Sequence, residues 1–137
     1  MKKFRNQKGV AAVEFAIILP VLILLIFGII EFSLLLYDKQ VITNASREGA
    51  RAGIVWADDR MSDGEIMDII DNYCLNYLIT FGTTNPPITT IARTGLDAGD
   101  NLTVTVTYDY DFLILPNFIA SLGGGKTLSA VTIMRME

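Results

Sequence analysis

One acidic side chain, Glu14, lies inside a segment that otherwise suits a membrane. Residues 10–37 are almost entirely apolar, and Glu14 interrupts them near their start. An acid near the centre of a bilayer costs about 2.5–3.5 kcal/mol on insertion scales, so it usually has a partner or a task. We therefore expect Glu14 to have a role beyond anchoring the chain.

The residue types that build most catalytic and metal centres are scarce. The sequence has no histidine and one cysteine, Cys74, which excludes His/Cys zinc sites, imidazole-based triads and intrachain disulfides. A lone cysteine at an apolar helical position is most often a small buried hydrophobe, and an intermolecular disulfide is the minor alternative. Asp109 and Asp111 share one face of a predicted strand, but calcium needs about six to eight oxygen ligands. We interpret them as part of a solvated face.

The segment SLGGGKT, residues 121–127, resembles the end of a phosphate-binding loop. That motif requires a glycine where Ala120 stands and a helix after the loop, whereas the residues after Thr127 suit a strand. A flexible loop is the preferred interpretation. With no catalytic set in view, we predict a protein that is not an enzyme and that uses no cofactor, metal or small-molecule substrate.

Charge is distributed unevenly along the chain. The net charge is −4, and residues 1–9 carry four cations and no acid, so the remainder carries −8. The bias of cations toward the cytoplasm predicts a cytoplasmic N-terminus and an exported C-terminal part. An acidic exported part gives no support for nucleic-acid binding, which needs a basic surface.

The apolar segment is predicted to continue into one long helix over residues 10–56. At about 1.5 Å per residue it would be roughly 70 Å long, half in the membrane and half outside. Pro20 should bend it, because proline removes a backbone donor and crowds the preceding turn. On the outer half, residues at spacings of three or four share a face; they are Val41, Ala45, Gly49, Ala52 and Trp56. The small residues Ala45, Gly49 and Ala52 let another backbone approach closely, so we predict helix packing there.

The rest of the chain predicts a small α+β head. Ser62 and Glu65 have the spacing of a capping box, which starts a second helix. Its apolar stripe has a period near 3.6, and Gly82 should cap its end; the stripe is Ile66, Ile69, Ile70, Tyr73, Cys74, Tyr77, Leu78 and Phe81. Residues 102–112 alternate between apolar and polar, as a half-buried strand does. Residues 128–136 suit a partner strand and 88–93 a weaker one, so we predict a small antiparallel sheet.

The start of the helix carries a family resemblance. Lys8-Gly9-Val10, with Glu14 and Phe15 fifth and sixth after the glycine, resembles the type IV prepilin processing motif. More narrowly, residues 8–53 are similar to TadE-like proteins of the tight-adherence (Tad) pilus system, and the closing LSAVTIMRME resembles that family's last strand.

The resemblance implies a processed membrane subunit of an adhesive pilus. A prepilin peptidase would cut between Gly9 and Val10, releasing residues 1–9 as a basic leader. Residues 10–37 would be the transmembrane and assembly helix, and residues 38–137 the extracytoplasmic head. The product would be a pseudopilin, or minor pilin, whose partners are other pilins and the assembly platform in the membrane. Family precedent pairs Glu14 with the new Val10 ammonium of a neighbouring subunit.

Two alternatives belong to other classes of protein. The chain could be an uncleaved single-pass anchor for an extracytoplasmic binding or sensory domain. It could also be a secreted enzyme or adhesin released by an ordinary signal peptidase. The N-terminal residue of the mature protein separates all three.

Overall fold

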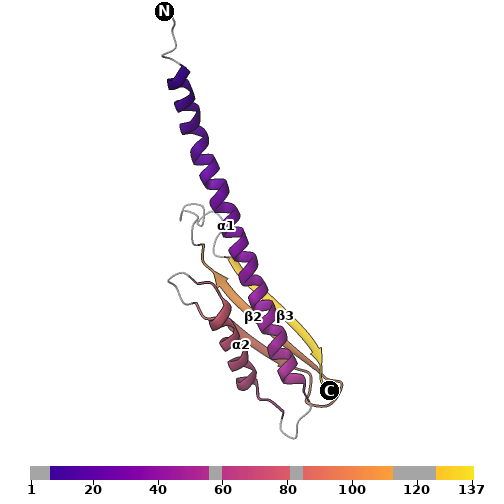
Figure 1. Cartoon of the computed structure of the whole chain (residues 1–137). Coiled ribbons are helices and arrows are strands. Elements are labelled where there is room, and N and C mark those ends of the chain that lie inside the picture. The colour runs from indigo at the N-terminus through magenta and orange to yellow at the C-terminus, as the bar shows by residue number, and fades with distance from the viewer. Residues whose placement is uncertain (1–6, 56–59, 81–84, 113–125) are drawn as a thin grey trace, which may run out of the picture.

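The computed structural model describes residues 7–55, 60–80, 85–112 and 126–137. The described chain forms two helices and a three-stranded sheet (Figure 1). In chain order these are α1 (Gln7–Ile54), α2 (Asp63–Tyr77), β1 (Ile88–Arg93), β2 (Asn101–Tyr110) and β3 (Lys126–Arg135). The α+β class and the long N-terminal helix are as the sequence predicts.

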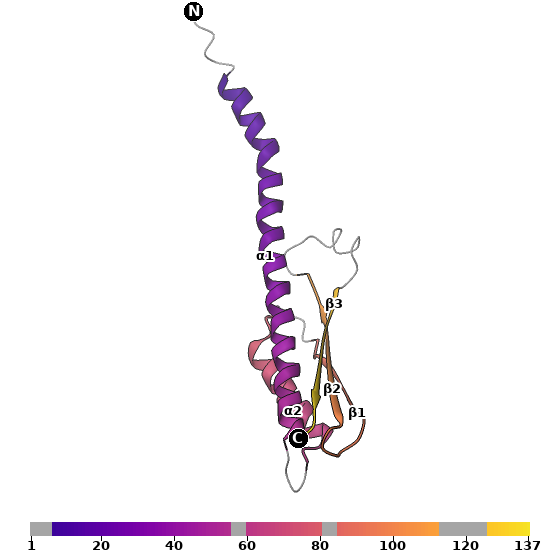
Figure 2. The same ribbon diagram turned by 90° about the vertical axis from the view of Figure 1, so that its right-hand side faces the viewer.

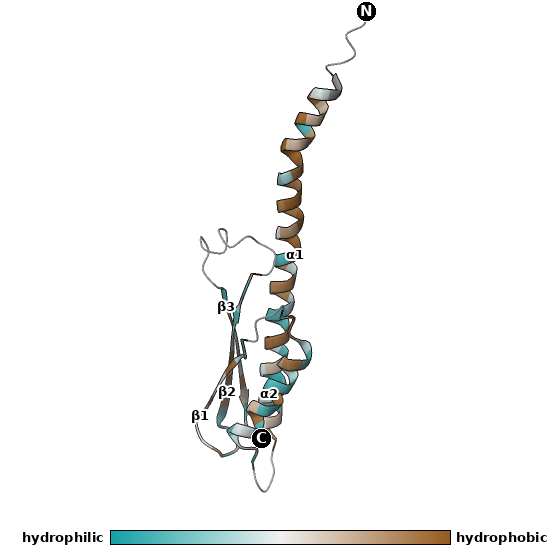
Figure 3. Cartoon of the chain, turned by 90° about the vertical axis from the view of Figure 1, so that its left-hand side faces the viewer, coloured by the Kyte–Doolittle hydropathy of each residue, from teal (hydrophilic) through white to brown (hydrophobic). Residues whose placement is uncertain are grey.

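The long helix α1 divides into a free half and a covered half. It has 48 residues and runs without interruption through Pro20, which corresponds to roughly 72 Å. Its N-terminal half projects away from the head, and its C-terminal half lies along the sheet (Figure 2). The free half is the most hydrophobic part of the chain (Figure 3). Trp56, expected at the end of this helix, lies outside the described residues.

The sheet is antiparallel with strand order β1-β2-β3. Its central strand alternates as predicted, with every second side chain buried from Leu102 to Tyr110. Thr103, Thr105 and Thr107 face the other way and are half-buried. All three predicted strands are present, including the weaker candidate at 88–93. The period of two places one face of the sheet against the helices.

The second helix starts where the sequence predicts and ends earlier. The Ser62 Oγ accepts a hydrogen bond from the Glu65 backbone N–H at 3.3 Å, and Glu65 Oε2 accepts one from the Ser62 N–H at 2.8 Å. The helix ends at Tyr77, because Leu78 is extended (φ −67°, ψ 135°). The predicted continuation of the helix through Leu78 is therefore wrong, although Leu78 still packs against the core. Phe81 and Gly82 lie outside the described residues.

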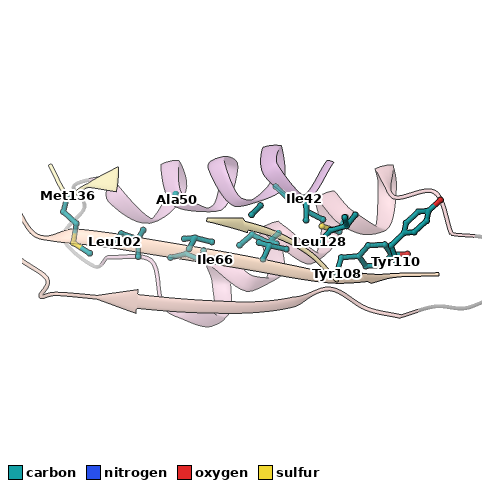
Figure 4. Close-up of a cluster of buried hydrophobic side chains, with 14 residues drawn as sticks. Ile42, Ala50, Ile66, Leu102, Tyr108, Tyr110, Leu128 and Met136 are labelled. Atoms are coloured by element: carbon teal, nitrogen blue, oxygen red, sulfur yellow. The ribbon is translucent and has the colours of Figure 1, made fainter. Parts of the chain in front are cut away.

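One hydrophobic core joins α1, α2 and the inner face of the sheet (Figure 4). Ile66, Ile70 and Cys74 of α2 are buried in it, whereas Tyr77 is 52% exposed. We expected the apolar stripe of α2 to pack on the sheet through Tyr77 as well, and for Tyr77 this is wrong. In Figure 4, Tyr108 and Tyr110 lie at one end of the core and Met136 at the other.

Candidate assembly helix and its attachment to the head

The residues of the predicted processing motif lie at the free end of α1. Val10, Glu14 and Phe15 are exposed, and a side chain built at Gly9 would meet nothing within 4 Å. Glu14 is four residues after Val10, so the two occupy one face of the helix. The geometry leaves this end of the helix open to a peptidase or to another subunit.

The small-residue face of the outer half of α1 is covered by the chain's own head. Ala45 is fully buried, Gly49 is buried and Ala52 is half-buried. A Cβ at Gly49 would lie 2.6 Å from two side-chain carbons of Ile70. Close packing at Gly49 therefore joins α1 to α2 within one molecule.

A further glycine, Gly53, has the same role and was not singled out in the sequence. A Cβ there would lie 2.6 Å from side-chain carbons of Ile66 and Leu102. Gly49 and Gly53 are one helical turn apart, so together they form a shallow groove for the α2 isoleucines. The spacing of the two glycines was the signal that could have revealed it.

The second acid of the apolar segment, Glu31, is held by the head. Its side chain is 2% exposed, and its Oε1 accepts a hydrogen bond of 2.7 Å from the Tyr110 hydroxyl at the end of β2. Glu31 lies near the outer edge of the apolar segment, and the sequence did not reveal that β2 folds back along α1 as far as this residue.

Asp38 lies two turns further along the same face of α1 and is fully buried. Its Oδ1 accepts a hydrogen bond of 3.1 Å from the Ile79 N–H, just after the end of α2. Its Oδ2 has no hydrogen-bond partner among the described residues. Burial raises the pKa of Asp38 above its ordinary value, and the Ile79 hydrogen bond opposes this only in part.

Polar contacts also tie α1 to β3. The buried Ser46 hydroxyl shares a hydrogen bond of 2.7 Å with the Thr132 hydroxyl, and the Lys39 ammonium donates to the Ser129 carbonyl. These contacts, with Glu31–Tyr110 at one end, fix the position of the head along the helix. None of these residues was singled out as a site from the sequence.

The described residues hold no group of three or more His, Cys, Asp or Glu side chains that could bind a metal. Asp109 and Asp111 are exposed; Asp109 accepts a hydrogen bond from Thr127 (2.7 Å) and Asp111 accepts one from Asn85 (3.1 Å).

Burial, with a smaller contribution from Asp71, raises the pKa of the Cys74 thiol to about 11. A thiol with this pKa is protonated at neutral pH and is a poor nucleophile.

These features define a protein with one apolar helix carrying a small folded head. Within the described residues, one helix, Gly9–Ile54, is long and apolar enough to cross a membrane by length and composition. The family model of TadE-like proteins matches residues 9–51, which include the motif from Gly9 to Phe15 and most of α1. The match confirms the resemblance and supports a TadE-like protein, of a family that is associated with the Tad pilus and is structural rather than catalytic. No curated protein and no solved structure matches the chain significantly.

Proposed function

We propose that this chain is a pseudopilin precursor that takes part in assembly of a Tad-type adhesive pilus. A prepilin peptidase removes residues 1–9, and the mature N-terminus is Val10. The N-terminus of the precursor is cytoplasmic, the head is extracytoplasmic, and the processed subunit joins other pilins and the assembly platform in the membrane. The match of residues 9–51 to the TadE-like family carries this proposal.

The surroundings of the motif support it. Val10, Glu14 and Phe15 make no contact with the head that would hide them, so both a peptidase and neighbouring helices can reach them. Once Gly9 is cut, Val10 acquires a positive charge four residues before Glu14. In lipid, a pair of opposite charges at close range costs much less than two isolated charges.

Glu14 then selects the axial register between subunits. A pairing of this kind is satisfied at one relative height of two helices and lost at others. The outer halves of the helices are covered by their heads, so the free segment from Val10 to Ile30 is the part that contacts other pilins.

The substitution Gly9→Val tests the processing step. A bulky side chain at this position should prevent the peptidase from approaching the backbone, so we expect the leader to remain attached and pilus assembly to be lost. Intact mass and N-terminal sequencing of the membrane protein provide the measurement. Gly28→Val is the matched control, because that position is also open on the same helix, and it should be processed normally.

The outcome also separates the alternatives. An intact N-terminus on the wild-type protein would favour an uncleaved anchored domain. A soluble product starting well beyond Val10 would favour an ordinary secreted protein.

A further inference from the structure

The boundary between the free and covered halves of α1 lies at Glu31. The side chains of Ile29 and Ile30 are still exposed, whereas Glu31 is buried by the head. From Val10 to Ile30 the helix measures about 32 Å, and the hydrocarbon core of a bilayer is about 30 Å thick. The free part of the helix alone therefore spans the core.

This length fixes where the head lies relative to the lipid. The headgroup layer adds about 5–7 Å on each side of the core, which corresponds to roughly four residues of helix beyond Ile30. The Tyr110 hydroxyl lies at the depth of Glu31, because it is bonded to that carboxylate. The Phe112 ring contacts Tyr110 edge-on, with ring centroids 5.8 Å apart, so it lies near the same depth.

The residues at this depth have the chemistry of a membrane interface. Phe32, within this layer, is 62% exposed on the helix. Leu36 and Tyr37, 51% and 44% exposed, follow about one turn further out. Tyrosine and tryptophan are enriched at the headgroup level, where one end of the ring can be wet and the other apolar. The apolar rings of phenylalanine can reach the acyl chains from the same level. The buried Glu31 carboxylate is shielded from lipid by the head and has the Tyr110 hydroxyl as a donor.

We propose that the Tyr110 end of the head rests on the outer surface of the bilayer, with phospholipid headgroups as its partner, and that the Glu31–Tyr110 hydrogen bond sets this position. The surface comprises Phe32 and Phe112 at this depth, with Leu36 and Tyr37 about one turn further out on the helix. The Tyr110 side chain itself is buried in the core. The inference rests on the membrane anchoring in the proposed function and goes beyond it by assigning a lipid-contacting surface to the head. Glu31 acts as a positioning residue.

Depth-dependent quenching of tryptophan fluorescence tests the proposal. The full chain, with its native tryptophan removed by Trp56→Phe, is reconstituted into phosphatidylcholine vesicles brominated either near the headgroup or deep in the acyl chains. Phe112→Trp is the test probe. Ile23→Trp reports on the middle of the span, and Ile133→Trp reports on the outer face of the sheet, where that side chain is 64% exposed.

We expect the tryptophan at 112 to be quenched at least about twofold more by shallow bromine than by deep bromine, as for a residue in the headgroup layer. The probe at 23 should show the opposite preference, and the probe at 133 should be quenched by neither lipid. Equal, weak quenching at 112 and 133 would overturn the surface contact. Failure of the probe at 23 to respond would instead overturn the membrane anchor in the proposed function.

A second comparison tests the hydrogen bond. Tyr110→Phe removes the donor, and we expect the shallow quenching at 112 to fall at least about twofold as the head loses its fixed depth. Glu31→Gln keeps an oxygen that accepts from Tyr110, so it should preserve the quenching profile. Circular dichroism confirms that each variant is folded before its profile is used. An unchanged profile in folded Tyr110→Phe would overturn the positioning role of Glu31.

Discussion

At the scale of single residues, the helix carries two acids in very different surroundings. Glu14 is exposed on the free half, whereas Glu31 is buried and hydrogen-bonded to Tyr110 within the same molecule. The partner of Glu31 is thus supplied by the chain itself. The partner that we propose for Glu14 must come from another subunit.

The substitution Glu14→Gln isolates this charge. The amide keeps the size of the side chain and removes a costly charge, so membrane insertion and leader removal should stay near normal. Without its counter-ion the neighbour's ammonium is left unpaired in lipid, so we expect co-purification of other pilins to fall strongly. Glu48→Gln, at an exposed position outside the span, is the control. Wild-type pilus levels with Glu14→Gln would contradict the pairing.

A second residue-scale prediction concerns pH. Because burial raises the pKa of Asp38 above its ordinary 3.8, the folded state holds this proton more tightly than the unfolded state does. Folding is therefore favoured by Asp38 at low pH, and this contribution is lost as pH rises from about 4 through the raised value. Asp38→Asn keeps an oxygen for the Ile79 N–H and removes the charge.

We expect the stability of Asp38→Asn relative to wild type to increase between about pH 4 and pH 7. Thermal unfolding of the full chain in detergent, followed by circular dichroism, measures it. Asp97→Asn, in an exposed turn, should show no such trend. A constant difference between Asp38→Asn and wild type across this range would show that Asp38 does not carry a buried charge.

At the scale of the elements, the head is held by the fit between α2 and two glycines of α1. Ile70 lies against Gly49, and Ile66 lies against both Gly49 and Gly53. Small residues on one helix thus accept branched side chains of another, and the sheet closes the core from the opposite side.

The substitution Ile70→Asp should break this fit. It places an unpaired charge where the native side chain is fully buried, and we expect a loss of about 3–4 kcal/mol in the free energy of unfolding. Leu75→Asp is the control on the same helix, because Leu75 is 82% exposed, and it should change stability by no more than about 0.5 kcal/mol. Equal denaturation midpoints for the two variants would refute the assigned face of α2.

Local sequence patterns predicted the helices and strands well, but they did not predict the contacts between those elements. The capping box at Ser62 and the alternation from Leu102 onward each involve neighbours in sequence, and both are confirmed. The end of α2 was misplaced because apolar residues continue past Tyr77, whereas the extended Leu78 directs the next N–H to Asp38. The burial of Glu31 depends on the end of a strand 79 residues away. The spacing of residues within the helix does not reveal how far along α1 that strand reaches.

At the scale of the whole molecule, the free half of α1 and the compact head predict a single orientation in the membrane. Four cations precede the span and an acidic head follows it. The bias of cations toward the cytoplasm therefore predicts that residues 1–9 lie inside and the head outside.

Cysteine labelling measures this orientation. In a Cys74→Ala background, Asp68→Cys lies on the exposed face of α2. We expect it to react with a membrane-impermeant maleimide in right-side-out vesicles and to be protected in inverted ones. Lys3→Cys, combined with Gly9→Val to retain the leader, should show the reverse. Reaction of both cysteines from the same side would exclude a single span between them.

The contacts between α1 and β3 have a consequence for the order of events during export. Lys39 and Ser129 are 90 residues apart in sequence, and Ser46 and Thr132 are 86 apart. In the proposed orientation, the outer half of α1 crosses the membrane first, and β3, which contacts it, crosses last among the described elements. Until then the part of α1 that β3 covers, including Ser46, fully buried in the finished head, is open to the solvent next to the membrane. Contacts this distant in sequence form slowly. The head thus passes through a stage in which the face of α1 that β3 later covers is exposed, and a secretory chaperone can bind it there.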